Sequence, residues 1–255
     1  MPFPRIIGRL DVKGNDLIKG VQLEGLRKLG DPNSFAKKYY KQGIDELIYI
    51  DSVASLYGRN NLLKIVQRTT KNVFIPVTVG GGIRNLNDIS LLLKSGADKV
   101  AINSEAIRNP IILKEAAEKF GSQCIVSSIV AKKHSKGWEV YIDGGRERTG
   151  VDAIEWAKKV IRLGAGEILV TSVDNDGCKI GFDVELIELI SKDCPIPITA
   201  SGGAGKKEHL LALINRCNVN AIAIGTIFHF NNLTIKEAKQ YLKENNIQVR
   251  ENNEY

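Results

Sequence analysis

Long hydrophobic runs and low-complexity segments are missing from this chain of 255 residues. No apolar stretch reaches the roughly 18 residues that a membrane-spanning helix requires. The N-terminal sequence MPFPRIIGRLDVKG becomes charged too early for a secretory signal peptide. Prolines number 7, and the 24 glycines are spread along the chain, so no flexible linker divides it. We therefore expect one soluble, cytoplasmic domain covering residues 1–255, without a membrane span.

Cysteine is scarce, and its spacing argues against several kinds of site. The four cysteines form no CxxC pair and have no histidine at zinc-ligand spacing. We therefore expect neither a disulfide framework nor a metal site. The cysteines are Cys124, Cys178, Cys194 and Cys217.

Positive charge is in excess, with 36 Lys and Arg against 29 Asp and Glu, a formal net charge of +7. This excess favours an anionic partner, which could be a phosphorylated metabolite, a nucleic acid or an acidic protein surface. The basic residues are dispersed and no aromatic-rich groove motif accompanies them, so we do not expect nucleic-acid binding.

Short β-branched runs alternate with amphipathic stretches of helix length, such as DPNSFAKKYYKQG and GVDAIEWAKKVIRLG. Eight strands that are apolar on both faces, each followed by a helix, in about 250 residues, predict a single (β/α)8 TIM barrel of the α/β class. LDVKGND, after the first strand, lacks the GxGxxG turn of an open dinucleotide-binding sheet. The predicted strands are RIIGRLDV (5–12), ELIYID (46–51), IPVTVG (75–80), KVAIN (99–103), QCIVSSIV (123–130), EILVTS (167–172), IPITAS (196–201) and AIAIG (221–225).

The second half of the sequence repeats the first. QGIDELIYIDS aligns with LGAGEILVTSV, and IPVTVGGGI aligns with IPITASGGA, both displaced by 121 positions. RIIGRLDVK aligns with QCIVSSIVAK, which places Asp11 opposite Val130. A repeat of about 120 residues is too long for one unit of a solenoid protein, but it has the length of four consecutive βα units. We therefore expect two half-barrels, about residues 1–121 and 122–255.

Glycines and small polar residues follow several predicted strands, where a barrel of this class carries its active site. Backbone N–H groups in such turns bind anions, although the same glycines also make ordinary tight turns. Because the clusters lie at repeat-related strand ends, we expect two phosphate sites and a long ligand with an anionic group at each end. The clusters are Gly80–Gly82 with Asn103 and Ser104, and Ser201–Gly203 with Gly225 and Thr226.

Three aspartates at strand ends are candidates for proton transfer. A carboxylate in a barrel mouth transfers protons when its surroundings raise its pKa. We expect this role for Asp11, whereas Asp51 and Asp174 are explained equally well as residues that hydrogen-bond loop backbones. Lys19 lies in a predicted loop from Gly14 to Gly20 and is either a solvated charge or a residue of a mobile loop that closes over a phosphate.

No histidine at a strand end has a catalytic partner in the sequence. His134 lies in KKHSKGWEVYIDGGRERTG, which predicts a β-hairpin inserted after the fifth strand. His229, in IFHF after the eighth strand, is expected to be packed and half-buried. We therefore do not expect nucleophilic hydrolysis of the Ser-His-Asp or Cys-His kind.

Charged residues stand at the starts of four predicted strands, at the end of the barrel that normally serves stability. From their chemistry alone, a salt-bridge ring that closes the barrel floor is the simpler explanation. Such a ring is also polar, hydrated and breakable, so it can act as a gate. We call these residues the floor ring: Arg5, Glu46, Lys99 and Glu167.

From RIIGRLDVK to the C-terminal helix, the chain resembles the cyclase subunit of imidazole glycerol phosphate synthase, the barrel that partners a glutaminase. In that family, ammonia from the glutaminase enters through the charged ring at the floor and travels along the axis. It reaches a doubly phosphorylated ribonucleotide intermediate, which is split into imidazole glycerol phosphate and an aminoimidazole carboxamide ribotide. No cofactor is implied. The matching segments are LDVK, GDP, GIDEL, TVGGGI, GADKVAIN, FGSQ, RTG, GAGEIL and SGGAGK.

The resemblance implies roles for individual residues. Asp11 matches the general acid/base of the first strand, Lys19 the phosphate-binding lysine of a mobile loop, and Asp98 the glutaminase interface; the floor ring matches the ammonia gate. One phosphate site, here the first cradle, comprises Gly82, Asn103 and Ser104, with Ser in place of the usual Thr. The other, here the second cradle, comprises Asp176, Gly177, Gly203, Ile224 and Gly225, the last two replacing Ala and Ser.

Two residues depart from the family pattern. The second catalytic aspartate, at the end of the fifth strand, falls on Val130, which cannot hold or release a proton. Losing one of two proton-transfer groups removes about two to four orders of magnitude of rate. Arg9 replaces a small residue on the same side of the first strand as Asp11.

An intact gate with half of the proton-transfer pair resembles a paralogous branch of the family that serves sugar-modifying amidotransferases. There, a glutaminase and the barrel deliver ammonia to a third enzyme, which converts an N-acetyl sugar of surface polysaccharide into an acetamidino sugar. We take this as the leading hypothesis. The alternative is a true cyclase of histidine biosynthesis with a displaced second acid/base. A sibling phosphoribosyl isomerase acting alone would not need the floor ring.

Overall fold

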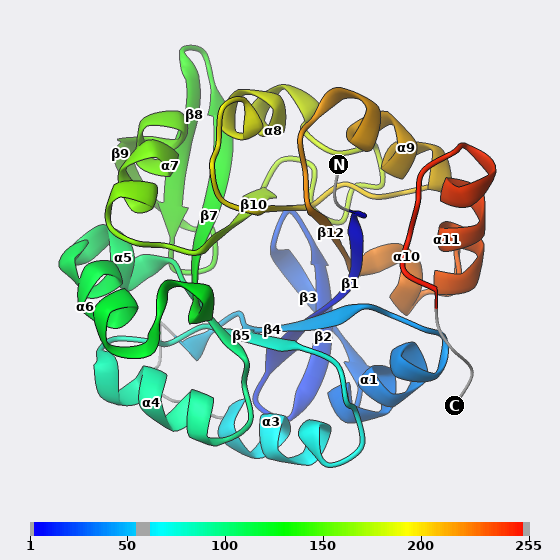
Figure 1. Ribbon diagram of the computed structural model, residues 1–255, viewed down its shortest axis with the longest axis horizontal. Coiled ribbons are helices and arrows are strands. Elements are labelled where there is room, and N and C mark those ends of the chain that lie inside the picture. Colours follow the sequence, from blue (N-terminus) through cyan, green and yellow to red (C-terminus); the bar gives the residue numbers. More distant parts are fainter. Residues whose placement is uncertain (1–2, 55–61, 252–255) are drawn as a thin grey trace.

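The computed structural model describes residues 3–54 and 62–251 and contains a closed barrel of parallel strands (Figure 1). Neighbouring strands pair in the order β1-β4-β5-β6-β7-β10-β11-β12, and β12 pairs with β1 to close the barrel. The predicted (β/α)8 fold is thus confirmed. The barrel strands are β1 (Arg5–Lys13), β4 (Glu46–Asp51), β5 (Val77–Gly80), β6 (Lys99–Ile102), β7 (Ile125–His134), β10 (Glu167–Ser172), β11 (Ile198–Ser201) and β12 (Ala221–Ile224).

Helices follow the barrel strands and cover the outside of the barrel (Figure 1). Helix α1 begins where Asp31 accepts a hydrogen bond from the backbone N–H of Ser34, and α7 begins at the equivalent cap Asp152. None of the described helices is long and apolar enough to cross a membrane. The helices are α1 (Pro32–Lys41), α3 (Leu62–Thr70), α4 (Leu86–Lys94), α5 (Ser104–Arg108), α6 (Ile111–Phe120), η1 (Ser122–Cys124), α7 (Ala153–Arg162), α8 (Val184–Ser191), α9 (Lys207–Arg216), α10 (Thr226–His229) and α11 (Ile235–Glu244).

Three of the predicted strands begin two residues later than the sequence suggested. The run from 123 begins at Ile125, because Ser122–Cys124 form a 3-10 helix. The runs from 75 and 196 enter the sheet only at Val77 and Ile198, because Pro76 and Pro197 have no N–H to donate to a neighbouring strand. The residues that follow the strands keep their predicted places. Asn103 therefore lies immediately after β6, at the mouth of the barrel.

Two β-hairpins extend the barrel at its mouth. The hairpin predicted after the fifth strand is present as β8 (Gly137–Ile142) and β9 (Glu147–Asp152), which continue β7. The prediction of a loop from Gly14 to Gly20 is wrong, since β2 (Asp16–Val21) and β3 (Glu24–Gly30) form a second hairpin that continues β1. Leu17 and Ile18 of β2 are buried, and this burial holds the segment as a strand. Each sequence half thus carries a hairpin after its first strand.

Alternate side chains of the barrel strands pack in two separate cores. The larger core lies between the strands and the helices, and contains Leu10 and Leu47. A smaller cluster of aliphatic side chains comes from six of the strands and occupies the inside of the barrel, between floor and mouth. Its members are Ile7, Ile48, Ala101, Val126, Leu169, Ala221 and Ala223.

Candidate functional site

The mouth of the barrel is spanned by one arginine side chain. Arg9 of β1 donates from Nε to Asp11 Oδ1 at 2.9 Å. Its Nη1 reaches two other strands and donates to Thr171 Oγ1 at 2.9 Å and to Ser201 Oγ at 3.0 Å. Arg9 and Asp11 are both almost fully buried. The sequence placed Arg9 on the same side of the strand as Asp11, and the structure brings the two charges into direct contact.

Lys19 lies inside this cluster. Its Nζ lies 2.6 Å from Asp176 Oδ2 and 3.3 Å from Asp11 Oδ2. The lysine is 5% exposed and belongs to strand β2. Of the two sequence interpretations, the solvated loop charge is therefore wrong. Lys19 links the β2–β3 hairpin to the mouth of the barrel.

Two cations control the charge of Asp11. Burial alone would raise the pKa of this carboxyl, but the positive charges of Arg9 and Lys19 outweigh burial and lower the pKa to about 2. Asp11 is therefore ionised at neutral pH. A carboxylate with so low a pKa is a weak proton acceptor, and it is not available as a proton donor.

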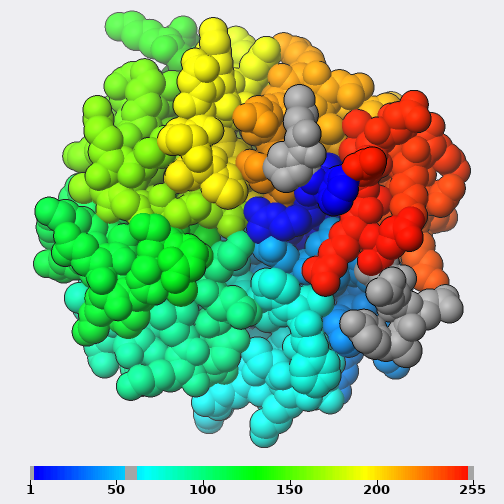
Figure 2. All heavy atoms as spheres, viewed as in Figure 1, coloured from blue at the N-terminus to red at the C-terminus, as the bar shows by residue number. Residues whose placement is uncertain are grey.

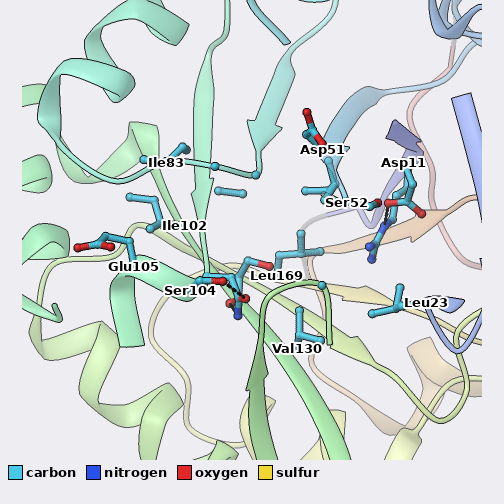
Figure 3. A pocket seen from close by; sticks show the side chains of 18 of the residues that line it. Asp11, Leu23, Asp51, Ser52, Ile83, Ile102, Ser104, Glu105, Val130 and Leu169 are labelled. Carbon is cyan, nitrogen blue, oxygen red and sulfur yellow. Dashed lines mark hydrogen bonds and ion pairs between the residues drawn. The ribbon is translucent and has the colours of Figure 1, made fainter. Parts of the chain in front are cut away.

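Val130, the position of the second family aspartate, lies in an apolar cluster. Its side chain packs with Tyr141, Val173 and Leu23. Figure 3 shows Val130 facing the cavity at some distance from Asp11 and Asp51. Val130 itself therefore offers no proton-transfer group to the cavity that it lines.

The first cradle lines the main cavity of the mouth, which has a volume of about 220 Å³ (Figure 3). Ser104 Oγ accepts a hydrogen bond from the backbone N–H of Asp143. The amide of Asn103 donates to the carbonyl oxygens of Ser128 and Tyr141, so this side chain is fixed by the β7 and β8 backbones. The structure thus brings the three predicted residues of this cradle to one cavity.

Two arginines of this cavity were missed by the sequence reasoning. Arg84 and Arg108 line the same cavity as Gly82 and Ser104. Arg108 forms an ion pair with Asp143 of the β8–β9 turn. Arg84 comes two residues after the glycine cluster, and that position at a strand end was the signal that could have identified it.

The second cradle is much smaller. Its five residues line one cavity of about 10 Å³, together with Arg9 and Lys19. That volume accommodates about one water molecule. The backbone of Gly177 packs so closely against the β2–β3 hairpin that a Cβ added there would lie 2.4 Å from the carbonyl oxygen of Gly20. The structure thus brings the predicted residues together, with the hairpin covering them.

The two other candidate aspartates contact loop backbones. Asp51 Oδ1 accepts from the N–H of Val53, and burial raises the pKa of the Asp51 carboxyl. Asp174 Oδ2 accepts from the N–H of Lys133 at 2.7 Å. Asp174 therefore has the structural role that the sequence left open, whereas Asp51 also lines the main cavity.

His229 is more deeply buried than expected. It is 6% exposed rather than half-buried, and its Nδ1 lies 2.6 Å from the hydroxyl oxygen of Tyr39. Burial, with a smaller effect of Lys19, lowers the pKa of His229 to about 4, so the ring is neutral at pH 7. Its Nε2 has no hydrogen-bond partner within residues 3–54 and 62–251.

The floor ring is closed by alternating ion pairs. Arg5 contacts Glu46 at 2.6 Å and Glu167 at 3.0 Å. Lys99 contacts the same two carboxylates at 3.4 and 2.7 Å. Thr199 Oγ1 also donates to Glu167. The structure therefore brings the four predicted residues together at the opposite end of the barrel from Asp11.

The floor also presents side chains to the outside. Asp98, next to Lys99, is exposed, and its Oδ2 accepts from the N–H of Val77. Phe3, two residues before β1, and Phe74, three residues before β5, are 54% and 76% exposed. Figure 2 shows this face, with the dark blue beginning of β1 near its centre.

Comparison with known proteins agrees with this architecture. Residues 5–234 match the family described as "Histidine biosynthesis protein". Proteins named "Imidazole glycerol phosphate synthase subunit HisF" are similar along their whole length. That of Legionella pneumophila is 58% identical over 205 residues, covering 80% of this chain and 97% of the relative. Those of Clostridium botulinum (strain Okra / Type B1) and Hydrogenobaculum sp. (strain Y04AAS1) are 49% and 50% identical, each covering 96% of this chain and 98% of the relative. The chain therefore belongs to the histidine biosynthesis protein family, together with HisF subunits of imidazole glycerol phosphate synthase.

Proposed function

We propose that this chain is the barrel subunit of a glutamine amidotransferase. It receives ammonia from a glutaminase subunit at the floor and passes it along the barrel axis to an acceptor at the mouth. The floor ring is the observation that carries this proposal. Its ion pairs are partly hydrated, since Arg5 and Lys99 keep 25% and 18% of their side chains exposed. Such pairs separate and re-form at lower cost than a packed aliphatic plug.

The inside of the barrel above the ring suits neutral ammonia. The side chains of Ile7, Ile48 and Leu169 are aliphatic, and three alanines lie in the same cluster. An ammonium ion would lose its hydration there without gaining a partner, whereas uncharged ammonia loses much less. The apolar lining therefore favours transfer of the neutral molecule.

A glutaminase that docks on the floor would contact Asp98 and the exposed Phe3 and Phe74. The test is co-purification with the glutaminase of the same organism, and calorimetric titration of the two proteins. Asp98→Lys is expected to weaken the complex by at least tenfold, whereas Glu115→Lys, on the exposed side of α6, leaves affinity unchanged. Equal affinity of the Asp98 variant and the parent would contradict docking at this face.

The names of the relatives favour imidazole glycerol phosphate formation as the acceptor reaction. In this case ammonia reacts at the mouth with the phosphoribulosyl aminoimidazole carboxamide intermediate of histidine biosynthesis. The first cradle would bind one phosphate of this intermediate, and Asp11 would stand beside the reacting atoms. The identity of about 50% over nearly the whole chain supports this function.

The mouth itself favours a second candidate, ammonia supply to a separate enzyme that forms an acetamidino sugar. Val130 supplies no proton-transfer group, and Arg9 holds Asp11 in its ionised form. Both features slow cyclisation without obstructing the floor. The deciding assay offers the ribonucleotide intermediate to the purified chain with ammonium salt, and to its glutaminase complex with glutamine. Rapid formation of imidazole glycerol phosphate establishes the cyclase and excludes the ammonia-supply function.

A further inference from the structure

The guanidinium group of Arg9 has donors that the protein does not use. Three of its five N–H groups are engaged, by Asp11, Thr171 and Ser201. The remaining two, on Nη2, have no hydrogen-bond partner in the part of the chain that the structure describes. Arg9 is only 5% exposed, and it lines the main cavity of the mouth. Arg9 also lines the small cavity of the second cradle, so a buried arginine keeps two unused N–H donors, its free edge, in the mouth of the barrel.

The three engaged donors hold this free edge in place. Asp11 fixes one end of the guanidinium plane, and the hydroxyl groups of Thr171 and Ser201 fix the Nη1 corner from two further strands. A guanidinium that is already oriented loses little conformational entropy when it binds a ligand. Each of the two Nη2 N–H groups can donate a charge-assisted hydrogen bond to an oxygen of a carboxylate or a phosphate.

Net charge does not select the ligand of the cavity, because cations and carboxylates line it in equal number. The cations are Arg9, Lys19, Arg84 and Arg108, and the acids are Asp11, Asp51, Glu105 and Asp176. The choice of ligand depends instead on which of these charged groups have no partner within the protein. Lys19 is held between two carboxylates, whereas the Nη2 edge of Arg9 is not paired. Val130, which lines the same cavity, adds no carboxylate to it.

The second cradle offers no alternative place for a second anionic group. Its cavity of about 10 Å³ is too small for a phosphate. The backbone N–H of Gln22 donates to the carbonyl of Asp176 at 2.7 Å, and the side chain of Gln22 donates to the carbonyl of Asp174. These bonds, together with Lys19, hold the β2–β3 hairpin over the cradle.

We infer that the free edge of Arg9 is an oxyanion-binding site at the centre of the mouth. The cavity then takes a phosphorylated acid, whose phosphate binds at the first cradle and whose carboxylate binds to Arg9. Arg9 is thereby the residue that determines specificity. This inference rests on the proposed function in one respect, that the mouth holds a ligand. It concerns binding alone, so it is tested without glutaminase or glutamine.

The experiment compares matched pairs of phosphorylated ligands by isothermal titration calorimetry. Each pair differs only by a carboxylate in place of a neutral hydroxymethyl group: 3-phosphoglycerate against glycerol 3-phosphate, and 6-phosphogluconate against sorbitol 6-phosphate. We expect at least one acid to bind the parent protein roughly tenfold more tightly than its neutral partner, as for one charge-assisted hydrogen bond. In Arg9→Met the preference disappears, while the neutral phosphates still bind and so report a folded first cradle.

A second variant keeps the test decisive if Arg9→Met does not fold. Thr171→Val with Ser201→Ala leaves the charge of Arg9 in place but removes two of its three anchors, and it is expected to reduce the preference at least threefold. Equal binding of acid and neutral partner by the parent in both pairs overturns the inference. A preference that persists in Arg9→Met also overturns it. Neither result affects docking of the glutaminase at the floor, which is measured separately.

Discussion

Arg9 and Asp11, two positions apart on β1, form an ion pair of 2.9 Å inside the mouth of the barrel. Where the family resemblance implies a pair of proton-transfer carboxylates, this chain has one carboxylate bound to a guanidinium and a valine packed in an apolar cluster. The two substitutions are therefore coupled in their effect. Restoring the missing aspartate alone would leave Asp11 locked in its ionised form.

The first prediction concerns recovery of cyclase activity. Val130→Asp alone is expected to change imidazole glycerol phosphate formation little, because Asp11 remains paired with Arg9. Val130→Asp with Arg9→Cys is expected to exceed the parent by about 100-fold or more, the usual contribution of a positioned acid/base. Formation of the product from the ribonucleotide intermediate with ammonium salt is the measurement. A single Val130 variant as active as the double variant would show that Arg9 does not restrain Asp11.

The second prediction concerns stability against pH. The pKa of Asp11 is about 2 in the folded chain and near 3.8 in the unfolded chain, so ionised Asp11 stabilises the fold above pH 4. This contribution, about 2 kcal/mol at pH 6, is lost as the pH falls from 4 to 2. The difference in urea unfolding free energy between the parent and Asp11→Asn should therefore shrink by about 1 kcal/mol from pH 6 to pH 3. A constant difference over this range would contradict the lowered pKa.

The barrel and the positions of its strand ends could be predicted from the sequence, because they depend on local patterns. Apolar runs, the sequence repeat and the glycines after strands can each be recognised in the sequence without knowing which distant segments meet in the fold. Asn103 accordingly lies at the mouth, and Glu46 lies at the floor. Each was predicted from its place relative to a strand.

The contacts that decide the chemistry of the mouth could not be predicted in this way. Arg9 reaches Thr171 and Ser201, which are 162 and 192 positions away. Lys19 is buried because the hairpin folds back over the barrel, and Gly14 and Gly20 interrupted the alternation that would have revealed strand β2. Such contacts follow from how distant segments meet in three dimensions, which no local pattern records.

The third prediction concerns the floor ring. Glu167 contacts Arg5, Lys99 and Thr199, and its side chain is only 9% exposed. Glu167→Gln leaves two partly buried cations to share Glu46, and is expected to cost about 2–3 kcal/mol of unfolding free energy in urea titrations. The matched control is Glu155→Gln, whose ion pair with Lys158 is 2.7 Å long but largely exposed, so its loss is expected to change the unfolding free energy much less. Similar losses in both variants would mean that the floor ring is no more than a surface salt bridge.

The fourth prediction concerns the hairpin over the second cradle. Gly177 has a φ of +77°, and a Cβ there would lie 2.4 Å from the carbonyl oxygen of Gly20, so Gly177→Ala must displace the hairpin backbone. We expect faster hydrogen exchange at the amides of β2 and a loss of about 1–3 kcal/mol in unfolding free energy. Gly25→Ala, in the same hairpin with a φ of +60° and open space around its Cβ, carries comparable backbone strain without the collision. The exchange rates of β2 should rise in the Gly177 variant only, because displacement, rather than strain, uncovers Lys19. If both variants accelerate exchange alike, the close packing of Gly177 does not hold the hairpin closed.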